Sequence, residues 1–301
     1  MIELIKELFG SENLTALHVA LISVFVTVST FFLTSYFKNL FENSLHARKL
    51  NTQHRLEEQK KIKEEISKYK IHLLTLCEDL DHRFLNLEKN HSENWIMVNS
   101  IFNEKENYYF HSTIYRFLCL YFWIKKAQKN MIFLDTTIAS KKDLEFIIFL
   151  KIFPNIMCDL DFILGPTANP NSEGDHFFKN IFEAFPDCIL DNDMPKSFEK
   201  YNEDLQNLQE NLKKLYIYFD GISPTESRNR WDRIHFLHLT VILFLNNYGY
   251  DFQKTNKEQL LEILRHPKRS IYLENYLNYL KKYKLHNNKE VKKLIKLLKI
   301  I

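Results

Sequence analysis

The sequence predicts an all-α protein with one N-terminal transmembrane helix, a long juxtamembrane stalk helix and a cytoplasmic helical bundle. Three observations predict this class. The stretch 13–37 lacks Asp, Glu, Lys and Arg, the 301 residues include only 5 Gly and 7 Pro, and apolar residues recur at helical spacing. Since Gly and Pro interrupt helices, their scarcity favours long helical segments. We divide the chain into segments 1–12, 13–37, 38–90 and 91–301.

The segment 13–37 is interpreted as a single membrane-spanning anchor. At about 1.5 Å per residue, a helix of this length crosses a hydrocarbon core of about 30 Å. The arm 1–12 before it is net acidic, and basic residues follow it: Lys38, Arg48, Lys49 and Arg55. Because positive charge collects on the cytoplasmic side, we expect a bacterial inner-membrane protein with its N-terminus outside and its body inside. A cleaved signal peptide is the alternative, but the arm lacks the basic residues that precede such a segment.

The segment 38–90 predicts one long helix that begins as a polar stalk. Beyond it, apolar residues recur in steps of four and three: Ile62, Ile66, Tyr69, Leu73, Leu76, Leu80, Phe84 and Leu87. This stripe is typical of a coiled coil, which would make the protein a homo-oligomer through residues 62–87. It is also typical of an amphipathic helix that packs on its own body, and both interpretations stay open.

The segment 91–301 predicts a series of shorter helices. The helix 108–129 is apolar nearly all round, so we expect it in the middle of a bundle, with an ionic or carbonyl partner for Arg116. Pro154 is expected to break or kink a helix over 141–164. The Gly- and Pro-rich stretch 165–175 predicts a surface loop. Further helices are predicted over 176–185, 197–219, 224–248 and 257–267. The segment 270–301 is aromatic first and then basic, and it is expected to end in a basic helix.

The C-terminal tail carries eight lysines against one glutamate from Lys281 onward. Its apolar residues share one face of a helix: Val291, Leu294, Ile295, Leu298 and Ile301. A basic amphipathic helix of this kind can lie on an anionic lipid surface, here through Lys292, Lys293, Lys296 and Lys299. The alternative is a terminal helix that docks its apolar face on the bundle and turns its lysines outward.

The stretch Glu226–Leu239 holds the candidate catalytic residues. Four residues separate Arg230 from His235, and four separate Arg233 from His238. An arginine can stabilise phosphoryl charge while a histidine transfers a proton. The spacing resembles the R-x4-6-H motif of HEPN-type ribonucleases, and this resemblance implies metal-independent RNA cleavage.

The resemblance to that family covers only these few residues and departs from its pattern. A polar residue commonly follows the arginine there, whereas Trp231 and Ile234 follow the two arginines here. The alternative is structural, with the arginines paired to neighbours and the histidines packed in the core. A nucleic-acid partner is expected only if the ribonuclease interpretation holds.

Other chemical sites are weakly indicated. Asp232, His235 and His238 could bind a metal, but three ligands at this spacing drift off one helix face. The four cysteines lie far apart without a C-x-x-C pair, and the net charge of +3 is too small to imply a nucleic-acid partner for the whole chain. We therefore expect no bound cofactor or metal. The uncharged stretch 234–250 is favoured as a buried core helix over a second membrane segment.

The overall layout resembles a group of bacterial membrane-anchored proteins that have one N-terminal span, a charged stalk and a helical cytoplasmic body. The stretches STIYRFLCLYFWI (112–124) and RWDRIHFLHLTVILFLNNYGY (230–250) carry this resemblance. The resemblance implies no particular activity, although some proteins of this layout act in bacterial defence against phage. We expect an interaction or effector module that is held at the membrane and is oligomeric. A tethered HEPN-like ribonuclease is the first rival, and a pore-forming effector is the second.

Overall fold

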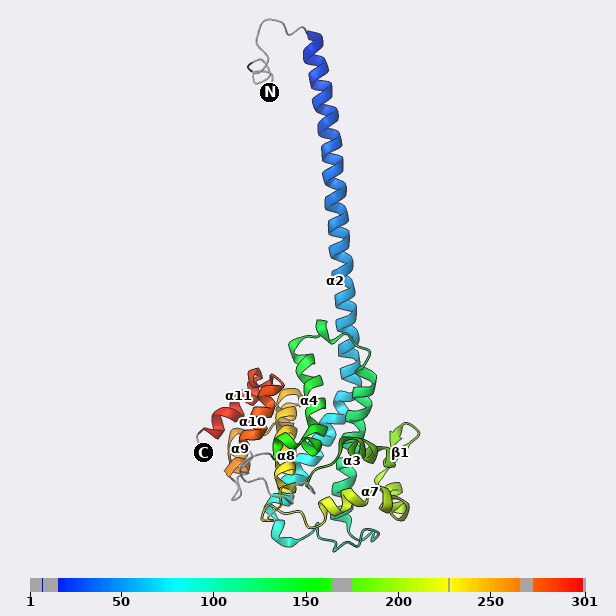
Figure 1. The fold of residues 1–301 in the computed structure, drawn as a ribbon, viewed down its shortest axis with the longest axis vertical. Coiled ribbons are helices and arrows are strands. Elements are labelled where there is room, and N and C mark those ends of the chain that lie inside the picture. The colour runs from blue at the N-terminus through cyan, green and yellow to red at the C-terminus, as the bar shows by residue number, and fades with distance from the viewer. Residues whose placement is uncertain (1–6, 8–15, 164–174, 227, 266–272, 300–301) are drawn as a thin grey trace. The chain divides into compact units, whose positions relative to one another are not determined.

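The computed structural model describes residues 7, 16–163, 175–226, 228–265 and 273–299. The all-α class is confirmed: helices dominate the described residues, whose strands are the two-residue β1 (Leu190–Asp191) and β2 (Met194–Pro195) (Figure 1). The chain divides into two units, Met1–Glu58 and Gln59–Ile301. The predicted arm 1–12 lies outside the described residues except for Glu7, and the predicted loop 165–175 lies outside them except for Asp175.

The first unit contains the N-terminal part of helix α2 (Ala16–Lys89). Its hydroxyl side chains bond to the helix itself. Ser23 Oγ donates to the carbonyl oxygen of Ala20 at 2.9 Å, and Thr27 Oγ1 donates to that of Ser23 at 2.7 Å. Thr30 Oγ1 likewise donates to the carbonyl oxygen of Val26 at 2.6 Å. These polar groups are therefore satisfied without water.

The second unit is built around the remainder of α2 and the helices that pack on it. The elements after α2 are η1 (His91–Glu93), α3 (Tyr108–Met131), η2 (Thr136–Ile138), α4 (Lys141–Cys158), η3 (Leu160–Phe162), α5 (Lys179–Ala184), η5 (Phe185–Ile189), α6 (Phe198–Glu203), α7 (Leu205–Phe219), α8 (Arg230–Tyr248), η6 (Asp251–Gln253), α9 (Lys257–Arg265), α10 (Leu273–Lys282), η7 (Leu285–Asn287) and α11 (Lys289–Leu298).

The apolar stripe of α2 is buried in this body. Seven of its eight residues, all but Leu76, are at most 8% exposed, and Leu76 is partly buried against the same core. The packing of the stripe on its own body is thus the arrangement that the structure has. An oligomer through residues 62–87 would have to use the faces of α2 that the stripe leaves exposed, and the apolar stripe gives no support for it.

Aromatic rings join α4 to α8 in the middle of the core. The ring centroid of Phe244 lies 5.4 Å from that of Phe146 and 5.7 Å from that of Phe153, and Tyr248 lies 6.1 Å from Phe149. Helix α8 is buried along nearly its whole length, as expected for residues 234–250. Such ring pairs stabilise a core beyond the area they bury.

Helix α3 is the buried central helix that the sequence predicts. Arg116 has the expected carbonyl partner, since its Nη1 donates to the main-chain oxygen of Ser112 at 3.0 Å. Its Nε also lies 3.9 Å from Asp79 Oδ2. The charge therefore stays at the edge of the core with a partner.

Helix α4 continues through Pro154 to Cys158. Proline has no N–H, so the carbonyl oxygen of Leu150 loses its usual helical donor. Gln128 of α3 replaces that donor, with Nε2 at 2.9 Å from the Leu150 oxygen. A neighbouring side chain thus allows the helix to pass the proline without a break.

Several predicted boundaries differ in the structure. The helix predicted over 141–164 ends at Cys158. The predicted helix 197–219 is two helices, α6 and α7, which meet at a turn at Asp204. The carboxylate of Asp204 binds Lys196 Nζ at 2.6 Å. Helix α8 begins at Arg230 rather than at residue 224. The strands β1 and β2 form a hairpin whose turn residues, Asn192 and Asp193, have φ of 47° and 66°. Asn and Asp tolerate these left-handed conformations.

The C-terminal helix docks on the bundle. Val291, Leu294, Leu297 and Leu298 of α11 are buried, and α11 packs on α8. Its apolar face is therefore not free to enter a lipid surface, and most of its lysines are exposed. Ile301 of the predicted stripe lies outside the described residues.

Candidate functional site

Arg230, the first residue of α8, is buried and binds the end of a neighbouring helix. Its Nη1 donates to the carbonyl oxygens of Ile217, Tyr218 and Asp220 at 3.2, 2.7 and 2.9 Å. Its Nε donates to Glu226 Oε2 at 2.6 Å. The last carbonyls of a helix have no partner within the helix, so Arg230 caps the C-terminal end of α7.

Arg233, one turn further along α8, does the same for α4. The side chain is fully buried, and its Nη1 donates to the carbonyl oxygens of Ile156 and Asp159, the latter at 3.0 Å. Burial lowers the pKa of this guanidinium. Two arginines three residues apart thus cap the C-terminal ends of two helices.

The two histidines are also buried. His238 Nε2 lies 2.9 Å from Asp81 Oδ1 of α2, within hydrogen-bonding distance. His235 lies beside Phe236, with the ring centroids 6.3 Å apart. Arg233 and His238 therefore bind different helices. Both arginines are buried, at 6% and 0% exposure, which keeps their guanidinium groups from an RNA phosphate. No group of three potential metal ligands occurs among the described residues, so the set Asp232, His235 and His238 has no support as a metal site.

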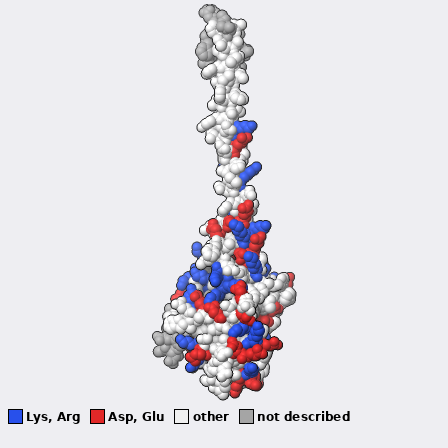
Figure 2. Space-filling model, turned by 90° about the vertical axis from the view of Figure 1, so that its right-hand side faces the viewer, with Lys and Arg blue, Asp and Glu red and all other residues white. Residues whose placement is uncertain are grey.

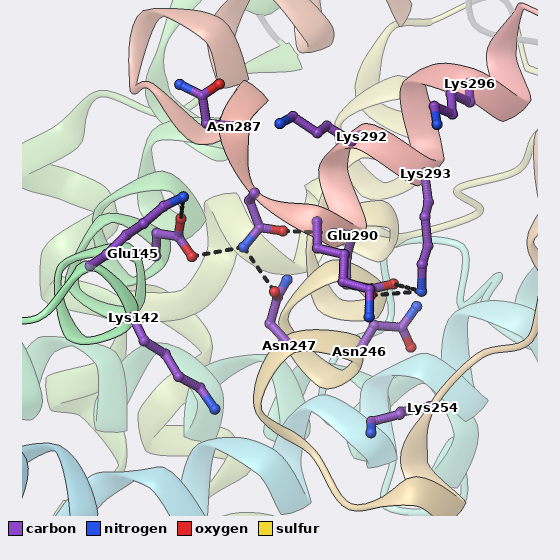
Figure 3. Close-up of a pocket in the computed structure, with 13 residues that line it drawn as sticks. Lys142, Glu145, Asn246, Asn247, Lys254, Asn287, Glu290, Lys292, Lys293 and Lys296 are labelled. Atoms are coloured by element: carbon purple, nitrogen blue, oxygen red, sulfur yellow. Dashed lines mark hydrogen bonds and ion pairs between the residues drawn. The ribbon is translucent and has the colours of Figure 1, made fainter.

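A groove on the second unit has a different character. Its volume is about 850 Å³, and charged and amide side chains line it (Figure 3). The lining residues are Lys141, Lys142, Glu145, Asn246, Asn247, Lys254, Asn287, Asn288, Lys289, Glu290, Lys292, Lys293 and Lys296. They come from the first turn of α4, the end of α8, the residue after η6, and the stretch from η7 into α11. We call this the lysine groove.

Asn288 holds the elements of the lysine groove together. Its Nδ2 donates to Glu145 Oε2 of α4 and to Asn247 Oδ1 of α8, both at 2.8 Å. Its Oδ1 accepts from the backbone N–H groups of Glu290 and Val291 at 2.9 and 3.3 Å, which caps α11. The buried Asn288 thus fixes the start of α11 against α4 and α8 (Figure 3).

The two glutamates of the lysine groove are already engaged. Glu145 accepts the Asn288 hydrogen bond and lies 3.9 Å from Lys141 Nζ. Glu290 binds Lys293 Nζ at 2.8 and 3.0 Å. Lys254 binds Asp251 at 2.7 Å. Within the described part of the chain, the four remaining lysines form no ion pair: Lys142, Lys289, Lys292 and Lys296.

The sequence indicated only part of this site. Three of the four lysines assigned to lipid contact, Lys292, Lys293 and Lys296, line the groove, and Lys299 does not. Lys141, Lys142, Lys254 and Lys289 also line the groove and are not among those four. The first three lie far from α11 in the sequence, and only the fold brings them to it. No family model, no curated protein and no solved structure matches the chain.

Proposed function

We propose that this is a single-span membrane protein whose helical body is an interaction or effector module at the cytoplasmic face of a bacterial inner membrane. One helix in the described part of the chain is long and apolar enough to cross a membrane, and none of its apolar window is buried. This observation carries the proposal. Large apolar side chains are exposed there, with Phe25 at 73% and Phe31 at 69%.

The exposed apolar surface argues for lipid around it. Each large apolar side chain left in water forgoes about 1.5–3 kcal/mol of burial free energy. The apolar part of α2 shows no Lys, Arg, Asp or Glu in Figure 2, and its Ser and Thr hydroxyls are hydrogen-bonded within the helix. Such a segment places few unsatisfied polar groups in a hydrocarbon core.

Paired substitutions test the anchor. The variant Phe25→Arg/Phe31→Arg places two charges in the apolar segment, and we expect it to leave the membrane fraction after alkaline extraction. The matched control, Leu50→Arg/Leu56→Arg, alters two exposed apolar residues of the polar stalk and should stay in the membrane fraction with the wild type. A wild-type protein found in the soluble fraction would contradict the proposal.

Cysteine labelling tests the orientation. In a background in which Ser replaces the native cysteines, Glu7→Cys should react with an impermeant maleimide in intact cells. Lys105→Cys, at an exposed position of the body, should react only after the inner membrane is opened. The basic residues after the span predict this direction, and the reverse labelling pattern would refute it.

The ribonuclease alternative has weaker support. It needs an arginine open to a phosphate, whereas Arg230 and Arg233 are buried and bound to main-chain oxygens. We expect the purified protein to cleave single-stranded RNA no faster than its His235→Ala variant does. Cleavage by the wild type that His235→Ala abolishes, with the fold intact by circular dichroism, would favour the ribonuclease instead.

A further inference from the structure

We propose that the lysine groove binds a ligand that carries two or more clustered phosphate groups. This inference goes beyond the membrane proposal and does not depend on it, since every residue it uses lies in the second unit. The ligand can reach the groove as a free polyphosphate or as the headgroups of an anionic lipid, and the experiment below separates these two sources.

The lysine groove has a strong net positive charge. Seven lysines and two glutamates line it, so the formal charge is seven minus two, or +5. Glu145 accepts a hydrogen bond from Asn288, and Glu290 accepts one from Lys293. Both glutamates are therefore poor partners for the other lysines. Like charges held around one hollow repel each other, and a polyanion in the groove relieves that repulsion.

Hydrogen bonds fix the helices of the lysine groove relative to one another. The hydrogen bonds of Asn288 to Glu145 and Asn247 fix the start of α11, which bears Lys289, Lys292 and Lys296. Lys142 of α4 and Lys292 of α11 both line the groove, from different helices (Figure 3). The backbone positions that carry these lysines are therefore fixed relative to α4, which lowers the cost of binding a ligand that bridges the two helices.

The chemistry of the lining identifies the ligand class. Lysine presents a compact point charge that suits phosphate oxygens. None of the 13 lining residues is aromatic, so the groove offers no ring on which a nucleobase could stack. Proteins that bind single-stranded nucleic acid rely on such stacking. The groove therefore fits clustered phosphates rather than RNA, and we expect tripolyphosphate and ATP to bind with similar affinity.

The test uses the full-length protein in detergent and isothermal titration with tripolyphosphate, ATP and citrate. The variant Lys142→Gln/Lys292→Gln/Lys296→Gln removes three groove lysines that have no ion pair among the described residues. The matched control Lys105→Gln/Lys213→Gln/Lys214→Gln removes three exposed lysines that do not line the groove. Flotation tests the lipid source. Vesicle binding is here the gain that phosphatidylglycerol adds over phosphatidylcholine vesicles alone, because the apolar segment of α2 can insert into both.

We expect both polyphosphates to bind the wild type and the control variant, and the groove variant to bind at least about tenfold more weakly. Binding should weaken as salt is raised. Vesicle binding that the groove variant loses, without tripolyphosphate binding, also supports the site and assigns the phosphates to lipid. The proposal is wrong if neither tripolyphosphate nor the vesicles bind, if the groove variant binds as the wild type does, or if citrate binds as tightly as tripolyphosphate.

Discussion

His238 of α8 and Asp81 of α2 form a buried hydrogen bond, with Nε2 and Oδ1 2.9 Å apart and side-chain exposures of 2% and 12%. The two residues are 157 positions apart in the sequence. The carboxylate can only accept, so the imidazole donates. This bond ties the most buried helix of the body to the helix that enters it from the stalk.

Loss of this bond should destabilise the body. We expect His238→Ala to lower the free energy of unfolding by about 2–4 kcal/mol, because it leaves the carboxylate of Asp81 without its partner in a buried site. Urea denaturation followed by circular dichroism measures the change. Asp81→Ala should cost a similar amount, and the double variant should cost less than the sum of the two. Additive effects would show that the two side chains are not coupled.

Glu88 gives the stability of the body a pH dependence. Burial raises the pKa of its carboxyl to about 7, whereas it is close to 4.5 when unfolded. The folded state therefore holds a proton that the unfolded state releases, and the stability contributed by Glu88 falls as the pH rises from about 4.5 to about 7. The stability of Glu88→Gln relative to wild type should rise by up to about 3 kcal/mol between pH 4 and pH 8. An unchanged difference across this range would exclude an abnormal Glu88.

His111 makes the stability of the body rise with pH, opposite to Glu88, over a pH range that overlaps that of Glu88. Burial lowers the pKa of its imidazole to about 4, although its Nε2 donates to the carbonyl oxygen of Glu104 at 3.0 Å. The unfolded state takes up a proton near pH 6.5 that the folded state refuses, so its contribution is lost as the pH falls from about 6.5 to about 4. In the wild type, the two slopes largely cancel. Urea titrations of His111→Gln should therefore expose a steeper loss of stability with rising pH.

Arg230 provides a test of helix capping. Arg230→Lys keeps the charge but loses the planar group that reaches Glu226 and the carbonyls of α7 together, so we expect a loss of about 2 kcal/mol. Arg228→Lys is the matched control. Arg228 binds Asp175 at 2.6 Å but its side chain is 40% exposed, so its loss should stay below about 1 kcal/mol. Equal losses for the two variants would argue against a capping role for Arg230.

The sequence predicts the helices of this protein better than their ends. The helix over residues 108–129 was predicted well because its apolar pattern is local. The break between α6 and α7 falls at Asp204, where no Gly or Pro marks it in the sequence. The passage through Pro154 uses a hydrogen-bond donor, Gln128, from another helix. The start of α8 lies at Arg230 partly because Asp175, far away in sequence, binds the N–H of Asn229 at 2.9 Å.

In the candidate site too, features that rest on neighbouring residues are predictable, and features that depend on residues far apart in the sequence are not. The lysines of α11 stand close together in the sequence, so their pattern predicts a basic surface. Lys142 lies 150 residues before Lys292 and joins it only in the fold. The R-x4-H spacing includes two buried arginines, Arg230 and Arg233, which cap helix ends. Their partners are main-chain carbonyl oxygens at the ends of α4 and α7, which leave no trace in a residue pattern.

The folded body begins close to Gln59 of α2. Gln59 Nε2 donates to the carbonyl oxygen of Ile138 at 2.8 Å, and Ile62 is the first fully buried residue of α2. A fragment of residues 59–301 therefore keeps all of the described core, and we expect it to be soluble and cooperatively folded, with a melting temperature within a few degrees of the full chain's.

A fragment of residues 75–301 is the control, because it lacks Ile62, Ile66, Tyr69, Leu73 and Leu74, which are at most 8% exposed. Loss of one large core side chain typically costs 2–5 kcal/mol, so the loss of five exceeds the stability of an ordinary domain. Thermal melts of the two fragments should differ accordingly, and a shorter fragment that folds as well as the longer one would show that the stripe of α2 is not part of the core.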